Sequence, residues 1–514
     1  MARDSISAPQ DGAARLTAAS PAAFLREPPS ALCSGFFGPH AICGWPRFRF
    51  PARLVQPVLD RLLGVLLLVT GIAVIIHEWL GLEFAGLVAA AGLGLFLVCA
   101  TPFTRWSRQA FVAIGLVLAG LAIAYLDDWP EVLAKAATQG AFISTFFIAL
   151  ASLRNPAAAS PAIDRCGQYL ASQPPGRRYM ALTIGGHLFA LILNYGSITL
   201  LGGLTEAIAG REKNAEIREI RNRRMLLAIQ RGLCASLCWS PLAFATAITT
   251  SVIAGSSWGG MAPYAMLFGL VFLVTGWALD TIFKPTLTGP RPPRSAPTGS
   301  MRDLLPLVML LALLFAVVGT LEFLTGLAIT AIVMAFVPLV SIGWIAYESA
   351  SAGETARRLK RLCFTELPSY RSELVLLIMA GVIGVLGAAL IQPLASGEAL
   401  DLSEVPIWLV LVTPVVVIPI LGQLGMNPIL SVSMLAPLLP APASLGLAPN
   451  LLVAAITAGW ALAGATSPFT ATTLLVGRLG HVSALTVGLV WNRAFTLWVM
   501  AIVGLMLVGF AELS

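Results

Sequence analysis

Charged residues are scarce in this sequence. Only 11% of its 514 residues are Asp, Glu, Lys or Arg, whereas a soluble domain typically carries about 25%. Hydrophobic residues make up 57% of the chain and fall into runs of the length that a transmembrane helix needs. Strands of a membrane barrel would instead alternate between apolar and polar residues. The sequence therefore excludes a soluble globular protein and predicts an all-α polytopic membrane protein.

Groups that carry chemistry are also scarce. The chain has four histidines, and its seven cysteines are too scattered for a disulfide framework. Cys234 and Cys238 share a helix face, but no His or acidic residue stands beside them, which favours packing over metal or redox work. The sequence shows no nucleotide-binding loop, so a primary pump would need a partner subunit. We predict no enzyme, no catalytic residue and no metal site.

The net charge of +7 is explained by where the basic residues lie. Most of the 32 Lys and Arg residues fall between apolar segments at positions that would be cytoplasmic, and only Lys135 falls in a predicted outer loop. This pattern predicts a protein of the cytoplasmic (inner) membrane of a bacterium, with its N-terminus inside and its C-terminus outside. The lipid bilayer is thus an expected partner, and nucleic acid is not.

Eleven spans satisfy this charge rule. Residues 1–54 lack a continuous apolar run, so we expect a disordered cytoplasmic arm, or a start site assigned too early. An extra first span (55–78) precedes a first repeat (79–283), a cytoplasmic linker (284–302) and a second repeat (303–514). The predicted spans lie near residues 57–76, 80–100, 109–126, 137–153, 232–254, 264–283, 303–320, 324–346, 373–392, 450–476 and 483–510.

Two further apolar segments are predicted to be re-entrant hairpins. Residues 181–204 have basic sequence on both sides, and a single crossing would leave the basic cluster 211–224 outside. A turn at 194–197 keeps both flanks in the cytoplasm. Residues 405–440 break at 425–428 and have no basic flank, which predicts a hairpin that enters from outside. Hairpins of opposite entry require an inverted-topology repeat.

Residues 205–231, between the first hairpin and the next span, alternate charge signs and carry few apolar side chains. This pattern predicts a separate helix that lies along the cytoplasmic face of the membrane.

A polar interruption recurs in two of the spans, 232–254 and 450–476. At an offset of 227 residues the copies share a glycine, a Ser-Pro pair eight residues later and a threonine six residues past the serine: Gly232, Ser240, Pro241 and Thr246, and Gly459, Ser467, Pro468 and Thr473. Proline within an apolar helix removes a backbone donor, so both spans should be broken helices. Matching interruptions in two halves of a membrane protein point to a transporter's binding site, although two kinks that only shape packing are the alternative.

This order of elements, over residues 57–510, resembles the ion transporter superfamily and, within it, the divalent anion/sodium symporters. At the hairpin turns, where those symporters carry Ser-Asn-Thr, this chain has Asn-Tyr-Gly-Ser at 194–197 and Asn-Pro-Ile-Leu-Ser at 427–431. The resemblance implies a substrate and coupling ions enclosed by hairpin tips and broken helices, in a homodimer. Related members transport citrate, arsenite, sodium against protons, or aromatic acids, so fold alone leaves the substrate open.

The candidate site consists of residues at the four interruptions. The predicted substrate- or ion-binding residues are Asn194, Gly196, Ser197, Ser240, Pro241, Thr246, Asn427, Pro428, Ser431, Ser467, Pro468, Thr470 and Thr473. Their neutral oxygens suit a hard cation such as Na⁺, and helix N-termini suit a carboxylate or oxyanion. Arg493 is a candidate partner for the anion, with snorkelling to the interface as the alternative. His187 is expected to be a hydrogen-bonded packing residue.

These observations favour a secondary active transporter that moves a small organic carboxylate or inorganic oxyanion by alternating access. No Asp or Glu falls near an interruption, which favours Na⁺ over H⁺ as the coupling ion. The alternatives are a uniporter or channel-like permease of the same fold and, less favoured, a membrane-embedded enzyme acting on a lipid-linked substrate.

Overall fold

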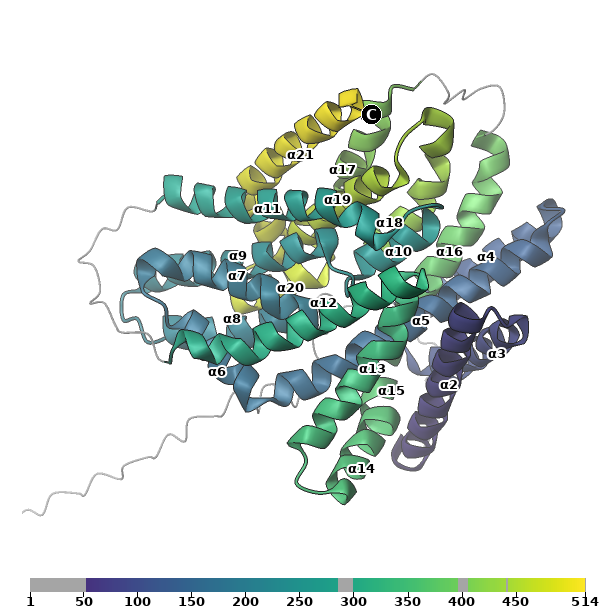
Figure 1. The fold of residues 1–514 in the computed structure, drawn as a ribbon, viewed down its shortest axis with the longest axis horizontal. Helices are drawn as coiled ribbons and strands as arrows, with labels where there is room; N and C mark the ends of the chain where they lie inside the picture. Colours follow the sequence, from purple (N-terminus) through teal and green to yellow (C-terminus); the bar gives the residue numbers. More distant parts are fainter. Residues whose placement is uncertain (1–51, 285–298, 396–404, 441, 514) are drawn as a thin grey trace, which may run out of the picture. The chain divides into compact units, whose positions relative to one another are not determined.

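A computed structural model of the chain describes residues 52–284, 299–395, 405–440 and 442–513. Within these ranges the structure is helical and contains no strand. Eleven of the described helices are long and apolar enough to cross a membrane (Figure 1). The predicted fold class, an all-α polytopic membrane protein, is confirmed. The predicted N-terminal arm (1–54) and the linker (284–302) lie almost wholly outside the described residues.

The described residues of the first half of the chain form ten α-helices. They are α2 (Ala52–Leu80), α3 (Glu83–Ala100), α4 (Trp106–Tyr125), α5 (Trp129–Ala159), α6 (Pro161–Ala171), α7 (Pro175–Leu193), α8 (Gly196–Ala209), α9 (Ala215–Trp239), α10 (Phe244–Val252) and α11 (Trp258–Ile282). In the predicted first hairpin, α7 and α8 are separated only by Asn194 and Tyr195. In the predicted first broken helix, α9 and α10 are separated by residues 240–243.

The described residues of the second half form ten further α-helices, which follow the order of the first half from the predicted hairpin onward. Its helices are α12 (Leu305–Thr325), α13 (Ile329–Glu348), α14 (Ala352–Arg361), α15 (Leu367–Ser369), α16 (Arg371–Ala395), α17 (Ile407–Gln423), α18 (Pro428–Leu435), α19 (Pro449–Thr466), α20 (Ala471–Leu479) and α21 (Arg493–Leu513). Two π-helical turns, η4 (Leu362–Glu366) and η8 (Thr486–Trp491), precede α15 and α21. Which side of the membrane each loop faces stays a prediction.

The separate surface helix predicted over 205–231 is wrong. The side chain of Asn214 accepts hydrogen bonds from the N–H groups of Glu216 and Ile217, and this N-cap sets the start of α9 at Ala215. The helix then continues without interruption to Trp239, and every residue from 225 to 238 is buried. The basic stretch is thus the first part of the first broken helix. Several of its charged residues stay exposed, whereas Arg224 forms two hydrogen bonds of 2.6 and 2.7 Å with the Asp280 carboxylate of α11.

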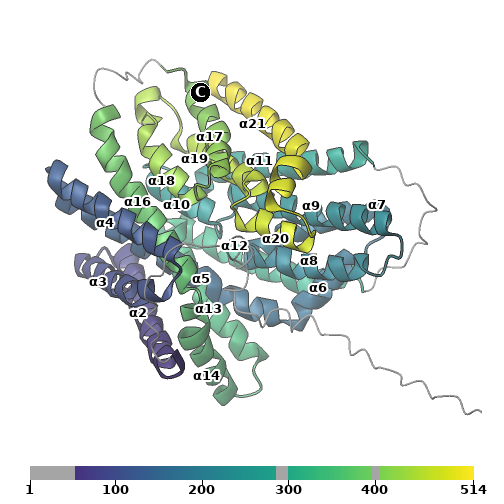
Figure 2. The same ribbon diagram turned by 180° about the vertical axis from the view of Figure 1, so that it is seen from behind.

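The hairpins and broken helices pack in corresponding pairs. In both views α7 runs beside α9, and α17 packs against α19 in the same way (Figures 1 and 2). The short helix that follows each break packs instead against the hairpin of the other half, α10 against α18 and α20 against α8. The four predicted interruptions therefore belong to one interlocked set of helices.

Candidate functional site

The two breaks, residues 240–243 and 467–470, have the same geometry. Ser240 lies at φ −65°, ψ 128° and Ser467 at φ −67°, ψ 124°. In each, the serine Oγ accepts a hydrogen bond from the N–H two residues on, at 3.2 and 3.3 Å. The serine carbonyl accepts one from the N–H three residues on, at 3.0 and 3.3 Å. Pro241 and Pro468, which have no N–H to give, occupy the position between. The backbone geometry of the first break therefore recurs in the second, 227 residues later.

The glycine shared by the two copies permits a close helix crossing. A Cβ atom at Gly232 would lie 2.2 Å from the carbonyl oxygen of Thr183 in α7. At Gly459 it would lie 2.3 Å from the carbonyl oxygen of Pro414 in α17. No side chain fits at either point, because real Cβ contacts do not fall below 3.0 Å. Each broken helix therefore meets its hairpin backbone to backbone.

The first hairpin tip is built around Asn194, whose φ of 50° few residues other than glycine adopt. Its carbonyl accepts a hydrogen bond of 2.7 Å from Ser197 Oγ. Its side-chain oxygen, Oδ1, is buried and has no hydrogen-bond partner within the described residues. Gly196, the first residue of α8, is buried beside it. The first tip thus holds an amide oxygen that is free to meet a ligand.

The second hairpin tip makes a similar turn with different residues. Gly425 supplies the positive φ of 90°, and Pro428 is the first residue of α18. The Asn427 side chain accepts a hydrogen bond of 2.9 Å from the N–H of Ile429, which caps the helix. The Asn427 carbonyl accepts one of 3.3 Å from Ser431 Oγ. Unlike its counterpart in the first tip, this asparagine oxygen already has a partner.

The second break contacts the second hairpin directly. Ser467 Oγ donates a hydrogen bond of 2.7 Å to the carbonyl of Gly422, at the end of α17. At the first break, the ring of Phe244 packs against Phe146 and Phe147 of α5, with centroids 5.3 and 6.1 Å apart. The predicted site hydroxyls of Ser240, Thr246, Ser467 and Thr473 belong to residues at most 2% exposed. A ligand could reach them only after neighbouring elements move.

Threonine hydroxyls close the second break. Thr473 Oγ1 donates to the Ser467 carbonyl at 2.5 Å, and Thr470 Oγ1 donates to the same carbonyl at 2.9 Å. A third hydroxyl, that of Thr472, donates to the carbonyl of Gly464 in the preceding turn. The carbonyls freed by this break are therefore satisfied by the protein itself.

The first break has no such closure. Alanines, Ala243 and Ala245, stand where the second break has Thr470 and Thr472. Thr246, the counterpart of Thr473, is fully buried, and its hydroxyl has no hydrogen-bond partner in the part of the chain that the structure describes. An orphaned buried hydroxyl costs about 1–3 kcal/mol. Two sites of equal backbone geometry thus differ in whether their buried hydroxyl groups are hydrogen-bonded.

Arg154 was missed as a candidate from the sequence. In the sequence the apolar run ends at Arg154 and Pro156 follows, which indicated the cytoplasmic end of a membrane span. In the structure α5 continues through Pro156 to Ala159. A Cβ on Gly196 would lie 3.3 Å from Nε of Arg154, which places the guanidinium at the first hairpin tip. Within the described residues its guanidinium forms no hydrogen bond or contact ion pair, although the Glu373 carboxylate interacts with it electrostatically. Arg154 thus places a positive charge at the candidate site.

The buried arginine Arg231 of α9 has only neutral partners among the described residues. It donates to Asn492 Oδ1 at 3.1 Å and to the Tyr179 hydroxyl at 3.0 Å. Asn492 in turn donates to Gln230 Oε1 at 2.9 Å and to the carbonyl of Ala465 at 3.2 Å. This network links α7 and α9 in the first half to α19 and the start of α21 in the second. Sequence patterns gave no signal for it, because its members are far apart in the chain.

Two other candidates have clear positions. His187 donates from Nδ1 to the carbonyl of Gly232 at 3.1 Å and stacks on Trp239, which is the packing role expected of it. Arg493 is exposed at the start of α21, while its neighbour Asn492 is buried. Cys234 and Cys238 are buried, and no group of metal-binding side chains occurs among the described residues.

The comparisons with known proteins bear on the fold. No family model and no curated protein matches the sequence. Among solved structures, the chain is similar to the Alcanivorax borkumensis YdaH transporter, a protein of unusual topology, with a TM-score of 0.52 and 17% sequence identity. The match covers 78% of this chain and 98% of that one. The chain thus has the fold of a membrane transporter. Its resemblance to the divalent anion/sodium symporters stays a prediction.

Proposed function

We propose that the protein is a secondary transporter that moves a small anion across the membrane by alternating access. The observation that carries the proposal is the pair of breaks: two Ser-Pro interruptions of equal geometry, buried among four packed elements. Interrupted helices at matching positions in two halves are typical of transporter sites. The transporter fold supports the same conclusion. An inverted-topology repeat and a homodimer are parts of this proposal.

The substrate we propose is an organic carboxylate or an inorganic oxyanion. The first turn of α8 and the guanidinium of Arg154 lie next to each other at the first hairpin tip. Helix N-termini present unpaired N–H groups and a partial positive charge, and arginine binds carboxylates and oxyanions through parallel hydrogen bonds. Both therefore favour an anion over a cation as the larger ligand.

The coupling ion we propose is Na⁺ rather than H⁺. Among the described residues, the buried oxygens without a partner at the first break and the first hairpin tip are both neutral: the Thr246 hydroxyl and the Asn194 amide oxygen. Hard cations prefer oxygen ligands of this kind. A proton-coupled site would instead be built on a carboxylate or histidine that titrates, and His187 is already engaged in packing.

The test is uptake into proteoliposomes that contain the purified protein. A panel of labelled carboxylates and oxyanions is offered under an imposed Na⁺ gradient, an imposed pH gradient, or neither. Accumulation against the substrate gradient with Na⁺ alone would support the proposal. Equilibration at the same rate under all three conditions would identify a uniporter or channel-like permease instead. Turnover of a lipid-linked substrate without any uptake would identify an enzyme.

Variants then locate the site. Asn194→Ala and Ser240→Ala should each raise the half-saturating concentration of substrate or ion by about tenfold or more. Asn427→Ala and Ser467→Ala should raise it by less, because the side-chain oxygens of Asn427 and Ser467 already have partners in the protein. The matched control is Ser236→Ala, one turn before the first break. Ser236 is also buried, but its hydroxyl bonds only within its own helix, to the carbonyl of Leu233 at 2.7 Å. If all four site variants fold and keep the wild-type half-saturating concentrations, the breaks have only a packing role.

A further inference from the structure

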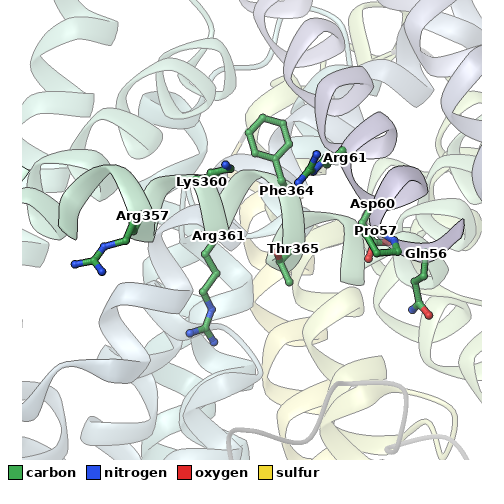
Figure 3. A pocket seen from close by; sticks show the side chains of 9 residues that line it. All are labelled: Gln56, Pro57, Asp60, Arg61, Arg357, Lys360, Arg361, Phe364 and Thr365. Carbon is green, nitrogen blue, oxygen red and sulfur yellow. The ribbon is translucent and has the colours of Figure 1, made fainter. Parts of the chain in front are cut away.

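A basic cavity of about 660 Å³ lies away from the breaks, between the first turns of α2, the helix α14 and the π-turn η4 (Figure 3). Four basic side chains line it: Arg61 from α2, and Arg357, Lys360 and Arg361 from α14. The one acidic residue in its lining is Asp60. Nothing in the proposed transport site requires this cavity.

Most of its positive charge is uncompensated. The Asp60 carboxylate is held by Arg371, outside the lining, at 3.1 Å. Arg361 pairs with Glu366 at 3.0 Å. Within the described residues, the other three basic side chains, those of Arg61, Arg357 and Lys360, have no ion-pair partner. A cavity with three free cations and a neutralised carboxylate attracts an anion.

The cavity walls are held in place by close packing. A Cβ atom at Gly64 of α2 would lie 2.5 Å from the carbonyl oxygen of Cys363 in η4, so the two backbones touch one turn beyond Arg61. Figure 3 shows Arg61 and Lys360 on the two sides of Phe364, which η4 supplies. Extra residues in a π-turn commonly serve to place side chains at binding sites.

An exposed apolar stripe runs along α2 on the helix face next to the one that lines the cavity, and it begins at Val58, directly after Pro57. Its members follow one another at intervals of three or four residues and are each between 42% and 68% exposed: Val58, Leu62, Val65, Val69 and Ile72. Such spacing puts them on one face of the helix. A membrane-spanning helix presents a face of this kind to lipid chains, so the basic cavity lies at the end of a lipid-facing surface.

We infer that the cavity binds the phosphate-bearing headgroup of an anionic phospholipid, whose acyl chains lie along the α2 stripe. Arginine and lysine bind phosphate oxygens through charge-assisted hydrogen bonds. Basic pockets between helices at the cytoplasmic face favour anionic lipids by about 1 kcal/mol for each Lys or Arg, which is about fivefold in affinity. The continuous stripe is what favours a lipid over a soluble phosphate.

The experiment measures lipid binding to the detergent-purified full chain by native mass spectrometry. The protein is titrated with dioleoyl phosphatidylglycerol, with dioleoyl phosphatidylcholine, with dihexanoyl phosphatidylglycerol, and with glycerol phosphate. The variant is Arg61→Gln/Lys360→Gln. The matched control is Arg211→Gln/Lys213→Gln, which removes the same charge from exposed residues between α8 and α9. Thermal midpoints in phosphatidylcholine establish that both variants fold.

We expect long-chain phosphatidylglycerol to bind most tightly, and the cavity variant to weaken it by about 25-fold, five for each charge. The control should retain wild-type affinity. Equal losses in the two variants would show that only general surface charge attracts the lipid, and would overturn the proposal. Wild-type affinity in the cavity variant would also overturn it. Glycerol phosphate or the short-chain lipid binding as tightly as the dioleoyl lipid would make this a site for soluble phosphates instead.

Discussion

The sharpest test of the candidate site compares two threonines at equivalent positions, Thr246 and Thr473. Thr→Val replaces a hydroxyl with a methyl group of similar volume, so packing is nearly conserved while the hydrogen bond is lost. Thr473→Val removes the 2.5 Å bond to the Ser467 carbonyl, which keeps a second donor in Thr470. We expect a loss of about 1–2 kcal/mol of stability, within the range for a buried hydrogen bond.

Thr246→Val should act in the opposite direction. Its hydroxyl is fully buried and has no partner within the described chain, so no bond is lost and an unsatisfied polar group is removed. Stability without ligand should stay equal or rise by up to about 1 kcal/mol. If this hydroxyl completes a ligand site, the half-saturating concentration of Na⁺ or substrate should rise by about tenfold or more, since a ligand contact of 1–3 kcal/mol is lost.

Two measurements on each variant decide the matter: the thermal midpoint in detergent without substrate or Na⁺, and half-saturation for uptake into proteoliposomes. The expected pattern is a stable variant with weak binding at position 246 and a less stable variant with smaller changes in binding at 473. If Thr246→Val were destabilised as much as Thr473→Val and kept wild-type half-saturation, its hydroxyl would have a structural partner. The assignment of the ligand to the first break would then fail.

Three further predictions concern the candidate anion contact, the buried polar network and the membrane topology. Arg154→Gln should raise half-saturation for the anion by about tenfold and leave that for Na⁺ within about twofold, with partial recovery in Arg154→Lys; equal effects on both ligands would argue against a direct anion contact. Asn492→Leu removes one hydrogen-bond partner each from Arg231 and Gln230 and should lower stability by about 1–3 kcal/mol, as judged by thermal unfolding. Arg493→Gln at the exposed neighbouring position should change it by less than about 0.5 kcal/mol. A cysteine placed at Ser295 should resist a maleimide reagent applied outside intact cells. Background labelling of the native Cys166 should be low, because burial, and secondarily the Asp303 carboxylate, raise the pKa of that thiol to about 12. The high pKa suppresses the reactive thiolate.

Features set by local sequence were the ones that could be predicted. Long apolar runs dictate helices in a membrane, and Pro241 and Pro468 dictate where two of them break. The matching Ser-Pro pairs even fix the hydrogen bonds that each serine accepts, since these come from N–H groups two and three residues further on. The turn at Asn194 could also be predicted, because asparagine is one of the few residues other than glycine that adopt a positive φ.

Features set by tertiary contacts could not be predicted. The basic residues before the first break looked like a surface helix because their partners, such as Asp280 for Arg224, lie far along the chain. Arg154 looked like a boundary because nothing local shows that α5 continues past Pro156 or that a hairpin tip lies beside it. The sequence shows that the second break has Thr470 where the first has Ala243. Only the structure shows that the Thr470 hydroxyl donates a hydrogen bond to the Ser467 carbonyl, a bond that alanine cannot make.

The glycine crossings have a mechanical consequence. At Gly232 and Gly459 the peptide backbones of neighbouring helices touch, with no flexible side chain between them to absorb a displacement. Each hairpin and the first part of its broken helix should therefore move as one stiff lever. Bending is left to the four-residue breaks, where the regular helical hydrogen bonds stop. One of these two joints is braced by three threonine hydroxyls and the other is not, so the unbraced joint is the softer of the two and the one at which motion should start.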